Sequence, residues 1–381
     1  MLPLGGMDAS HAHLRWIAAL VAVVAGASVL LLAAPAPPAR ARALIGIGDQ
    51  KPAMFSDPRF RWLQVRRARL VVSWNVLQTP WERRWVDSWL TQARAAGVEP
   101  LIAFGHAWDG PQRRLLPSVK AYRHAFSAFR ARYPWIKDYT PWNEANHCSQ
   151  PTCNHPERAA AYYGVVLRGC RSCQIVAADV LDQPNMVAWL RAFRRAAPGT
   201  PRLWGLHNYL DANRLRSTGT KRLLAAVPGR VWFTETGGLV RRKHYRKQIA
   251  FEESAAHAGL ATSWILKLAA EQPRVKRVYL YQWNADSTTQ AWDSGLVGPF
   301  GETRPAFAVL ARFTGKDPSK APGNQPTTPA PAPPPNEEPP PTSSAQPPAQ
   351  EQQPPPAQSP PPPPPSSPPP PPCLLGVICG L

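Results

Sequence analysis

The sequence predicts an α/β fold, in which a single (β/α)8 TIM barrel precedes a disordered, proline-rich C-terminal tail. Three observations support this prediction. Between residues 44 and 315, short β-rich runs alternate with longer amphipathic runs, as they do in βαβ units around a parallel sheet. Eight such units in about 270 residues match the ~250 residues usual for this barrel. Polar side chains gather where the predicted strands end, which is where such barrels place their chemistry.

Each predicted strand is a short run rich in aliphatic and aromatic residues, and each predicted helix repeats apolar residues every three or four positions. In chain order, the strands are Ala43–Asp49, Ala68–Val76, Glu99–His106, Asp138–Glu144, Gln174–Asp182, Leu203–Tyr209, Arg230–Glu235 and Val278–Trp283. The helices that follow them are Asp57–Arg66, Trp81–Ala96, Ser118–Tyr133, Pro156–Gly169, Pro184–Ala197, Asn213–Val227, Tyr245–Glu271 and Arg304–Phe313.

Both ends of the chain depart from this pattern. Residues 1–43 contain the apolar run Trp16–Ala34 followed by small residues, which predicts a cleaved signal peptide or a retained N-terminal membrane anchor. Either one would export the barrel to the cell surface, the cell wall or the medium. Residues 316–372 hold more than half of the 48 prolines and few apolar side chains, so they cannot build a core and form a dispensable linker. Residues 373–381 are a short apolar end between Cys373 and Cys379, with no predicted role.

The formal net charge is +20, and residues 44–315 carry the whole of this excess. A basic exported protein would bind anionic glycans, cell-wall polymers or lipid head groups. An arginine-rich composition alone also produces such a charge, so this alternative stays open. Nucleic acid is not an expected partner, because no nucleic-acid-binding motif is present and the cations are scattered.

Two glutamates end predicted strands that lie opposite one another. Glu144 ends the fourth strand, Glu235 ends the seventh, and three βα units separate them. Side chains that reach inward from opposed strands would bring the two carboxyl groups to the ~5–5.5 Å that double-displacement glycoside hydrolysis needs. That chemistry uses one carboxyl as acid/base and one carboxylate as nucleophile. The alternative is that each glutamate is a structural ion-pair partner.

The sequence around these residues resembles the clan A glycoside hydrolases. Trp142-Asn143-Glu144-Ala145-Asn146 is similar to the acid/base motif of family 39, in which a proline usually stands at the position of Ala145. Thr234-Glu235 resembles the nucleophile strand of the clan. The other matching positions are Arg69 on the second strand, His207 and Tyr209 on the sixth, and Trp283 on the eighth.

The resemblance implies a role for each of these residues. Glu144 would be the acid/base and Glu235 the nucleophile, with Arg69 and Tyr209 stabilising the ionised Glu235. A raised pKa would keep Glu144 protonated, and Asn143 would contact the 2-hydroxyl of the sugar. Trp283 would stack on a sugar ring, and His207 is either a site residue or a core histidine. Further sugar platforms are expected among the tryptophans Trp74, Trp108, Trp142, Trp204 and Trp292.

The cysteines are expected to form local disulfides. Cys148 and Cys153 form one close pair, and Cys170 and Cys173 form another. The helix predicted between the pairs would hold them ~20 Å apart, too far for one zinc site. Export favours oxidation, so Cys148–Cys153 and Cys170–Cys173 are the predicted bonds.

The sequence thus predicts a retaining hydrolase of β-linked glycosides that uses no cofactor and no metal. One alternative is a non-catalytic, glycan-binding surface protein on the same barrel. Another is a metal-dependent barrel hydrolase, which is disfavoured because the first strand lacks a His-x-His pair. The identity of the sugar is left open.

Overall fold

The computed structural model describes residues 43–108, 110–242 and 251–323. Its main feature is a nine-stranded sheet in which all paired strands are parallel, in the order β5-β4-β3-β2-β1-β10-β8-β7-β6. The strands are β1 (Leu44–Gly48), β2 (Arg67–Ser73), β3 (Glu99–Gly105), β4 (Asp138–Thr140), β5 (Gln174–Ile175), β6 (Asp179–Leu181), β7 (Leu203–His207), β8 (Arg230–Thr236) and β10 (Val275–Tyr281). The α/β class of the prediction is confirmed.

The two terminal strands of this sheet are consecutive in the chain. β5 and β6 lie within the single strand predicted at Gln174–Asp182 and are separated by residues 176–178. The amide of Val176 donates to Tyr139 beside β4, and the amide of Ala177 donates to Leu203 on β7. The segment from β5 to β6 therefore connects the two ends of the curled sheet, which makes the fold TIM-barrel-like.

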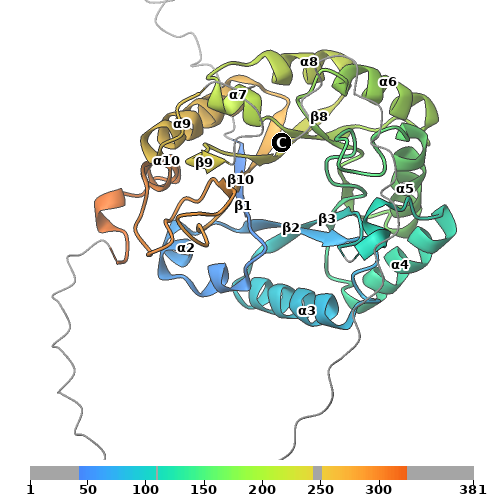
Figure 1. Cartoon of the computed structure of the whole chain (residues 1–381), viewed down its shortest axis with the longest axis horizontal. Coiled ribbons are helices and arrows are strands. Elements are labelled where there is room, and N and C mark those ends of the chain that lie inside the picture. Colours follow the sequence, from blue (N-terminus) through green and yellow to red (C-terminus); the bar gives the residue numbers. More distant parts are fainter. Residues whose placement is uncertain (1–42, 109, 243–250, 324–381) are drawn as a thin grey trace, which may run out of the picture. The chain divides into compact units, whose positions relative to one another are not determined.

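Helices surround the sheet in a ring (Figure 1). They are α2 (Pro58–Leu63), α3 (Pro80–Ala95), α4 (Val119–Arg132), α5 (Pro156–Gly169), α6 (Met186–Ala196), α7 (Tyr209–Asn213), α8 (Thr218–Ala226), α9 (Ala255–Glu271) and α10 (Pro305–Phe313). Side-chain caps begin several of them, as where Ser118 accepts from the amide of Ala121 at 3.1 Å. Each long helix buries one apolar face; on α6 this face includes Trp189, Leu190 and Phe193.

Element boundaries differ from the prediction where side chains interrupt the pattern. The helix predicted at Asn213–Val227 begins later, as α8, and the separate short helix α7 precedes it. The carboxylate of Asp211 in α7 accepts from the amides of Gly219 and Thr220 and so caps α8. The helix predicted at Tyr245–Glu271 is α9, whose N-cap is Ser254. A two-stranded antiparallel pair, β9 (Arg241–Arg242) and β11 (Trp292–Asp293), was not predicted.

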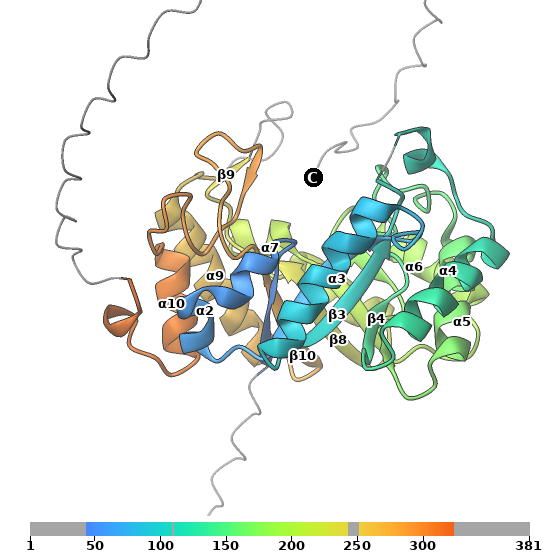
Figure 2. The same cartoon turned by 90° about the horizontal axis from the view of Figure 1, so that it is seen from below.

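The side view in Figure 2 shows β9 and the loops near it above the sheet. These loops follow the carboxyl ends of the strands, and the amino ends lie at the opposite edge. No described helix is long and apolar enough to span a bilayer. The predicted signal or anchor in residues 1–43 lies outside the described residues except for Ala43, and so do the tail after residue 323 and the 373–381 end with Cys373 and Cys379.

Candidate active site

Glu144 and Glu235 lie beside one pocket at the carboxyl end of the sheet. The pocket has a volume of about 270 Å³, and its lining consists of Gln50, Val71, Asn143, Glu144, Leu181, Tyr209, Glu235, Tyr281 and Trp292. A carboxylate oxygen of Glu144, one of Glu235 and a ring nitrogen of His207 all lie within 4.8 Å of one another. The two carboxyl groups are thus close enough to act on one bond.

The backbone at Glu144 is held in an unusual conformation. β4 ends at Thr140, four residues earlier than predicted, and Glu144 has a φ of 47°. A left-handed φ is unfavourable for a residue with a side chain and is stored where surrounding contacts impose it. Here the amide of Asn143 donates to Phe104 on β3, and the amide of Ala145 donates to Asp179 on β6. The neighbouring strands thereby fix the position of Glu144.

Glu235 is held at both carboxylate oxygens. The guanidinium of Arg69 on β2 donates to Oε2 at 2.6 Å, and the hydroxyl of Tyr209 donates to Oε1 at 3.0 Å. Burial and the neighbouring carboxylate raise the pKa of Tyr209 well above its usual value, so its phenol stays protonated and remains a donor. These are the contacts that the sequence comparison implied for Arg69 and Tyr209.

Asp179 and His207 connect the two glutamates. His207 Nδ1 lies 3.0 Å from Glu144 Oε1, and its Nε2 lies 3.2 Å from Asp179 Oδ2. Asp179 also accepts from Arg69 at 2.9 Å and from the hydroxyl of Thr234. The sequence analysis did not select Asp179. One feature of the sequence could have identified Asp179, since it is the charged residue in the apolar run Val176–Leu181. A carboxylate buried in such a run needs polar partners.

The pKa values in this network differ from the expected pattern. Burial lowers the pKa of His207, but the carboxylates of Asp179 and Glu235 and its two hydrogen bonds outweigh burial and raise the pKa to about 10. Burial raises the pKa of Glu144, yet the hydrogen bond and charge of His207 bring it below its usual value. The expectation that Glu144 keeps its own proton is therefore wrong for this structure. The shared proton resides on His207, one hydrogen bond away.

The pKa of Asp179 supports the same arrangement. Burial would raise it, but the charges of His207 and Arg69 lower it to about 2, so Asp179 is ionised at neutral pH. His207 is fully buried and bonded on both ring nitrogens, which excludes direct contact with a large ligand. Its place is between the acidic groups rather than in the open pocket.

The same three residues are a candidate metal site, since Glu144, His207 and Glu235 each offer one ligand atom. The surrounding charges oppose a cation there. The guanidinium of Arg69 donates to Glu235 and lies 3.2 Å from Nε2 of His207. Any cation among the three side chains would face this positive group at short range and compete for the same oxygens.

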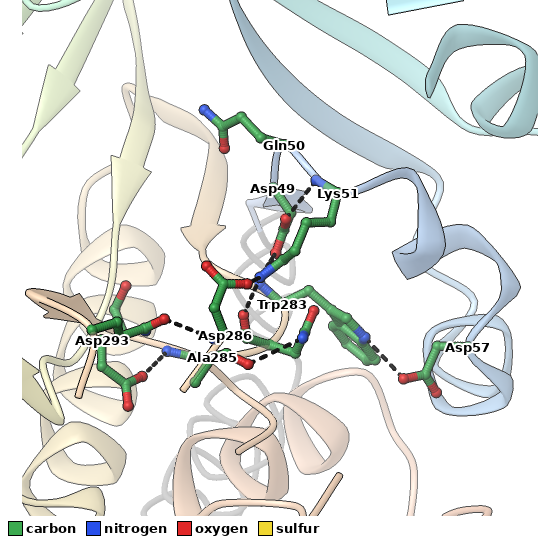
Figure 3. Close-up of polar contacts among 12 residues, drawn as sticks. Asp49, Gln50, Lys51, Asp57, Trp283, Ala285, Asp286 and Asp293 are labelled. Carbon is green, nitrogen blue, oxygen red and sulfur yellow. Dashed lines mark hydrogen bonds and ion pairs between the residues drawn. The ribbon is translucent and has the colours of Figure 1, made fainter. Parts of the chain in front are cut away.

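Trp283 does not lie in the pocket. It is 1% exposed, packs edge-on against Phe60 and Phe307, and its indole nitrogen donates to Asp57 at 3.0 Å. Figure 3 shows the indole directed toward Asp57. Asp49 fixes this arrangement, because its carboxylate accepts from the backbone amide of Trp283 at 2.9 Å. The structure therefore gives Trp283 no ring face for a sugar.

Other aromatic side chains line the pocket where a sugar-stacking Trp283 was expected. Trp292 and Tyr281 line the pocket, and the ring of Trp292 meets that of Tyr209 edge-on at 4.9 Å between centroids. The Gln50 side chain points away from the cluster around Asp49 (Figure 3) and also lines the pocket. Asn143 accepts a hydrogen bond from Arg69 through Oδ1, which leaves its amide nitrogen available as a donor.

The cysteines near the site are only partly as predicted. Cys170 and Cys173 form the predicted disulfide, whereas the sulfurs of Cys148 and Cys153 lie 2.9 Å apart without a disulfide bond between them. The loop that carries Cys148 and Cys153 is already closed by backbone hydrogen bonds, including those from Gln150 to His147 and from Cys153 to Gln150. The predicted Cys148–Cys153 bond is not formed in this structure.

No protein-family model and no curated protein matches the sequence. Among solved structures, the fold is similar to the exo-β-1,4-mannosidase Op5Man5 from Opitutaceae bacterium strain TAV5, with 13% identity, a TM-score of 0.52, and coverage of 72% of this chain and 59% of that one. It is also similar to a family 5, subfamily 18 glycoside hydrolase from Bifidobacterium longum, solved with Manβ1-4GlcNAc, with 12% identity, a TM-score of 0.51 and 72% and 78% coverage. The chain spans less than two thirds of the mannosidase. This distant similarity to clan A glycoside hydrolases concerns the fold.

Proposed function

We propose that this protein is a retaining hydrolase of β-linked glycosides, built on a single (β/α)8 barrel and closest in its motifs to family 39. The observation that carries the proposal is the separation of the two carboxyl groups, which approach within 4.8 Å at their oxygens. Double displacement needs ~5–5.5 Å, whereas inversion needs ~6.5–9.5 Å to admit a water molecule between sugar and base.

In the first step, Glu235 attacks the anomeric carbon. The bond from this carbon to the glycosidic oxygen breaks while Glu235 forms a bond to the carbon, and the leaving oxygen takes a proton from Glu144. Arg69 and Tyr209 hold the attacking carboxylate in place through its two oxygens. The free amide protons of Asn143 are available to the 2-hydroxyl, and Trp292 offers an apolar face to the ring.

The proton for this step comes from the His207–Glu144 pair. At rest His207 holds it, 3.0 Å from Glu144 Oε1. A sugar in the pocket excludes water from Glu144 and so favours its neutral form, which draws the proton across this hydrogen bond. In the second step, Glu144 accepts a proton from water, water attacks the anomeric carbon, and Glu235 is released.

The proposal includes an exported location and a carbohydrate partner, both from the sequence. The glycan-binding alternative uses the same pocket without turnover. A panel of aryl β-glycosides and plant and wall polysaccharides, offered to the purified protein, separates the two functions. Turnover supports hydrolysis, and binding without turnover supports the alternative.

Variants of the two glutamates test their roles. Glu235→Ala should lower kcat by several orders of magnitude on every substrate, because no covalent step remains. Glu144→Ala should keep substantial glycosylation of substrates with good leaving groups, and added azide should accelerate it and give a β-glycosyl azide. An α-azide from Glu144→Ala, or equal losses in the two variants without azide rescue, would overturn the assignment.

A further inference from the structure

The end of the barrel opposite the pocket has an excess of exposed cations. Lys137, Arg171, Arg202 and Arg230 stand on the segments that lead into β4, β5, β7 and β8. Backbone pairing places them at one edge, since Gln174 donates to Lys137 and Arg230 donates to Arg202. All four side chains are exposed, and none makes an ion pair with a described residue.

Helix ends add to this surface. Helices in this fold run against the strands, so α5 and α6 end at the same edge, where Arg168 and Arg195 are exposed. Cations at helix C-termini complement the helix dipole and need no partner. Lys137, Arg171, Arg202 and Arg230 lie outside helices, so the dipole does not explain them.

The excess is local and does not follow from composition alone. Exposed acids at this edge include Glu99, which pairs with Arg67 at 3.0 Å, Glu271, which lies 3.9 Å from Lys267, and Asp317. At the pocket end, exposed acids such as Glu157, Asp286 and Glu302 are mixed with exposed arginines. An arginine-rich composition would enrich both ends alike.

We propose that this basic face, defined by Lys137, Arg168, Arg171, Arg195, Arg202 and Arg230, docks on an anionic lipid surface. The position of the N-terminal end supports a membrane rather than a soluble polymer. Leu44, the first residue of β1, pairs with Arg277 at this edge and is 47% exposed. The segment that contains the apolar run Trp16–Ala34 is therefore joined to the barrel at this face.

A hollow in the basic face carries the side chains typical of a lipid interface. Its volume is about 410 Å³, and its lining includes the half-buried Trp135 and the exposed Arg94 and Lys137. The two acids in the lining, Glu99 and Asp138, each pair with an arginine. The guanidinium carbon of Arg94 lies 5.6 Å from the Trp135 ring centroid. Tryptophan beside basic residues is characteristic of membrane interfaces, where the ring meets the headgroups and the cations meet their phosphates.

Docking by this face has a consequence for the pocket. The strands run from the basic face to the pocket, so a membrane at one end leaves the other end open to solvent. The inference does not depend on the proposed hydrolase activity, because the residues concerned are not those of the pocket.

Vesicle binding of the full chain tests this inference. Binding to phosphatidylcholine vesicles is compared with binding to vesicles containing one third phosphatidylglycerol, so that the N-terminal apolar run contributes to both. The triple variant Lys137→Gln, Arg171→Gln, Arg202→Gln is matched by Arg113→Gln, Arg114→Gln, Arg214→Gln at the pocket end. Both remove three exposed cations.

Phosphatidylglycerol should increase the vesicle affinity of the wild type. This increase in affinity should be roughly a hundredfold smaller in the first variant, at about fivefold per cation, and should change by no more than about twofold in the second. Raised salt should weaken the wild-type gain. Equal losses in the two variants, or no gain from phosphatidylglycerol in the wild type, would overturn the inference. If the first variant loses binding to dextran sulfate but binds vesicles like the wild type, the partner of the basic face is an anionic polymer and the inference is overturned. Thermal unfolding verifies that both variants are folded.

Discussion

Two buried arginine–aspartate pairs lie at opposite ends of the barrel and have different roles. At the pocket end, Arg69 meets Asp179 at 2.9 Å, and both side chains are at most 1% exposed. At the basic face, Arg277 pairs with Asp138 and lies 3.8 Å over the ring of Trp232. The residue types are the same, so the difference lies in what else each arginine contacts.

Arg69 also bonds to the two residues that face the pocket, Glu235 and Asn143. Arg277 bonds to Tyr279 and lines the hollow in the basic face, which contains neither glutamate. The aspartates titrate differently as a result. Partner charges outweigh burial and lower the pKa of Asp179 to about 2, whereas burial prevails at Asp138 and raises its pKa. A buried ion pair is thus part of the proposed reactive site only where it contacts the residues that carry the chemistry.

The largest expected difference follows from neutralising each aspartate. Asp179→Asn leaves Arg69 and His207 without their shared counter-charge. It also lowers the pKa of His207, which the charge of Asp179 raises. Turnover should fall by roughly 10²–10⁴-fold. Asp138→Asn should change turnover less than twofold. Asp179→Asn should lose about 3–5 kcal/mol of stability, because it leaves buried charges unpaired. The raised pKa of Asp138 means that Asp138→Asn should lose less.

Steady-state kinetics and denaturant unfolding measure the two effects separately. A similar loss of turnover in both variants would show that general destabilisation, and not contact with the site, governs activity. That result would remove the distinction between the two pairs.

A third buried aspartate, Asp182, sharpens the comparison because it has no arginine at hydrogen-bonding distance. Burial and the charge of Asp211 raise its pKa to about 7. Folding thus favours the protonated form of Asp182. The stability that this form contributes is lost as pH rises from about 4 to 7. Asp182→Asn should stabilise the protein by up to about 4 kcal/mol at pH 8 and have little effect near pH 4.

Thermal unfolding across this pH range measures the trend. The control is Asp286→Asn at the exposed rim of the same end, which should show no such dependence. A stabilisation by Asp182→Asn that is constant with pH would mean that Asp182 is not forced to ionise in the fold.

The smallest effect concerns the backbone of the two glutamates. Glu144 has a φ of 47°, whereas Glu235 lies in β8 with strand geometry. Glu144→Gly should be about 1 kcal/mol more stable than Glu144→Ala, because glycine adopts a left-handed φ without strain. At Glu235 the order should reverse, with glycine about 0.5–1 kcal/mol less stable than alanine. Unfolding in urea compares the four variants, and the same order at both positions would contradict the strain at Glu144.

The sequence predicted the α/β class and the alternation of strands and helices, because strand and helix periodicities are local properties. It also selected Glu144, Glu235, Arg69 and Tyr209, which the structure brings together as expected. Glu144, Tyr209 and Glu235 lie at or just after the carboxyl ends of strands, which converge at one face whatever the packing of their neighbours.

What the sequence could not predict depends on side-chain direction. Trp283 follows the end of β10, as a site residue would, but Asp49 and Asp57 hold it in the core. Asp179 lies inside an apolar strand, and only the three-dimensional positions of Arg69 and His207 identify its role. The lowered pKa of Glu144 has the same origin, since it results from the hydrogen bond to His207, which comes from another strand.

The most direct test of the central assignment is the anomeric configuration of the first product. Proton NMR of a β-glycoside turned over by the wild-type protein, recorded before mutarotation, distinguishes the two outcomes. The spacing of Glu144 and Glu235 predicts a β-configured product, formed by two successive displacements. An α-configured product at the earliest times would contradict a covalent intermediate on Glu235 and with it the proposed mechanism.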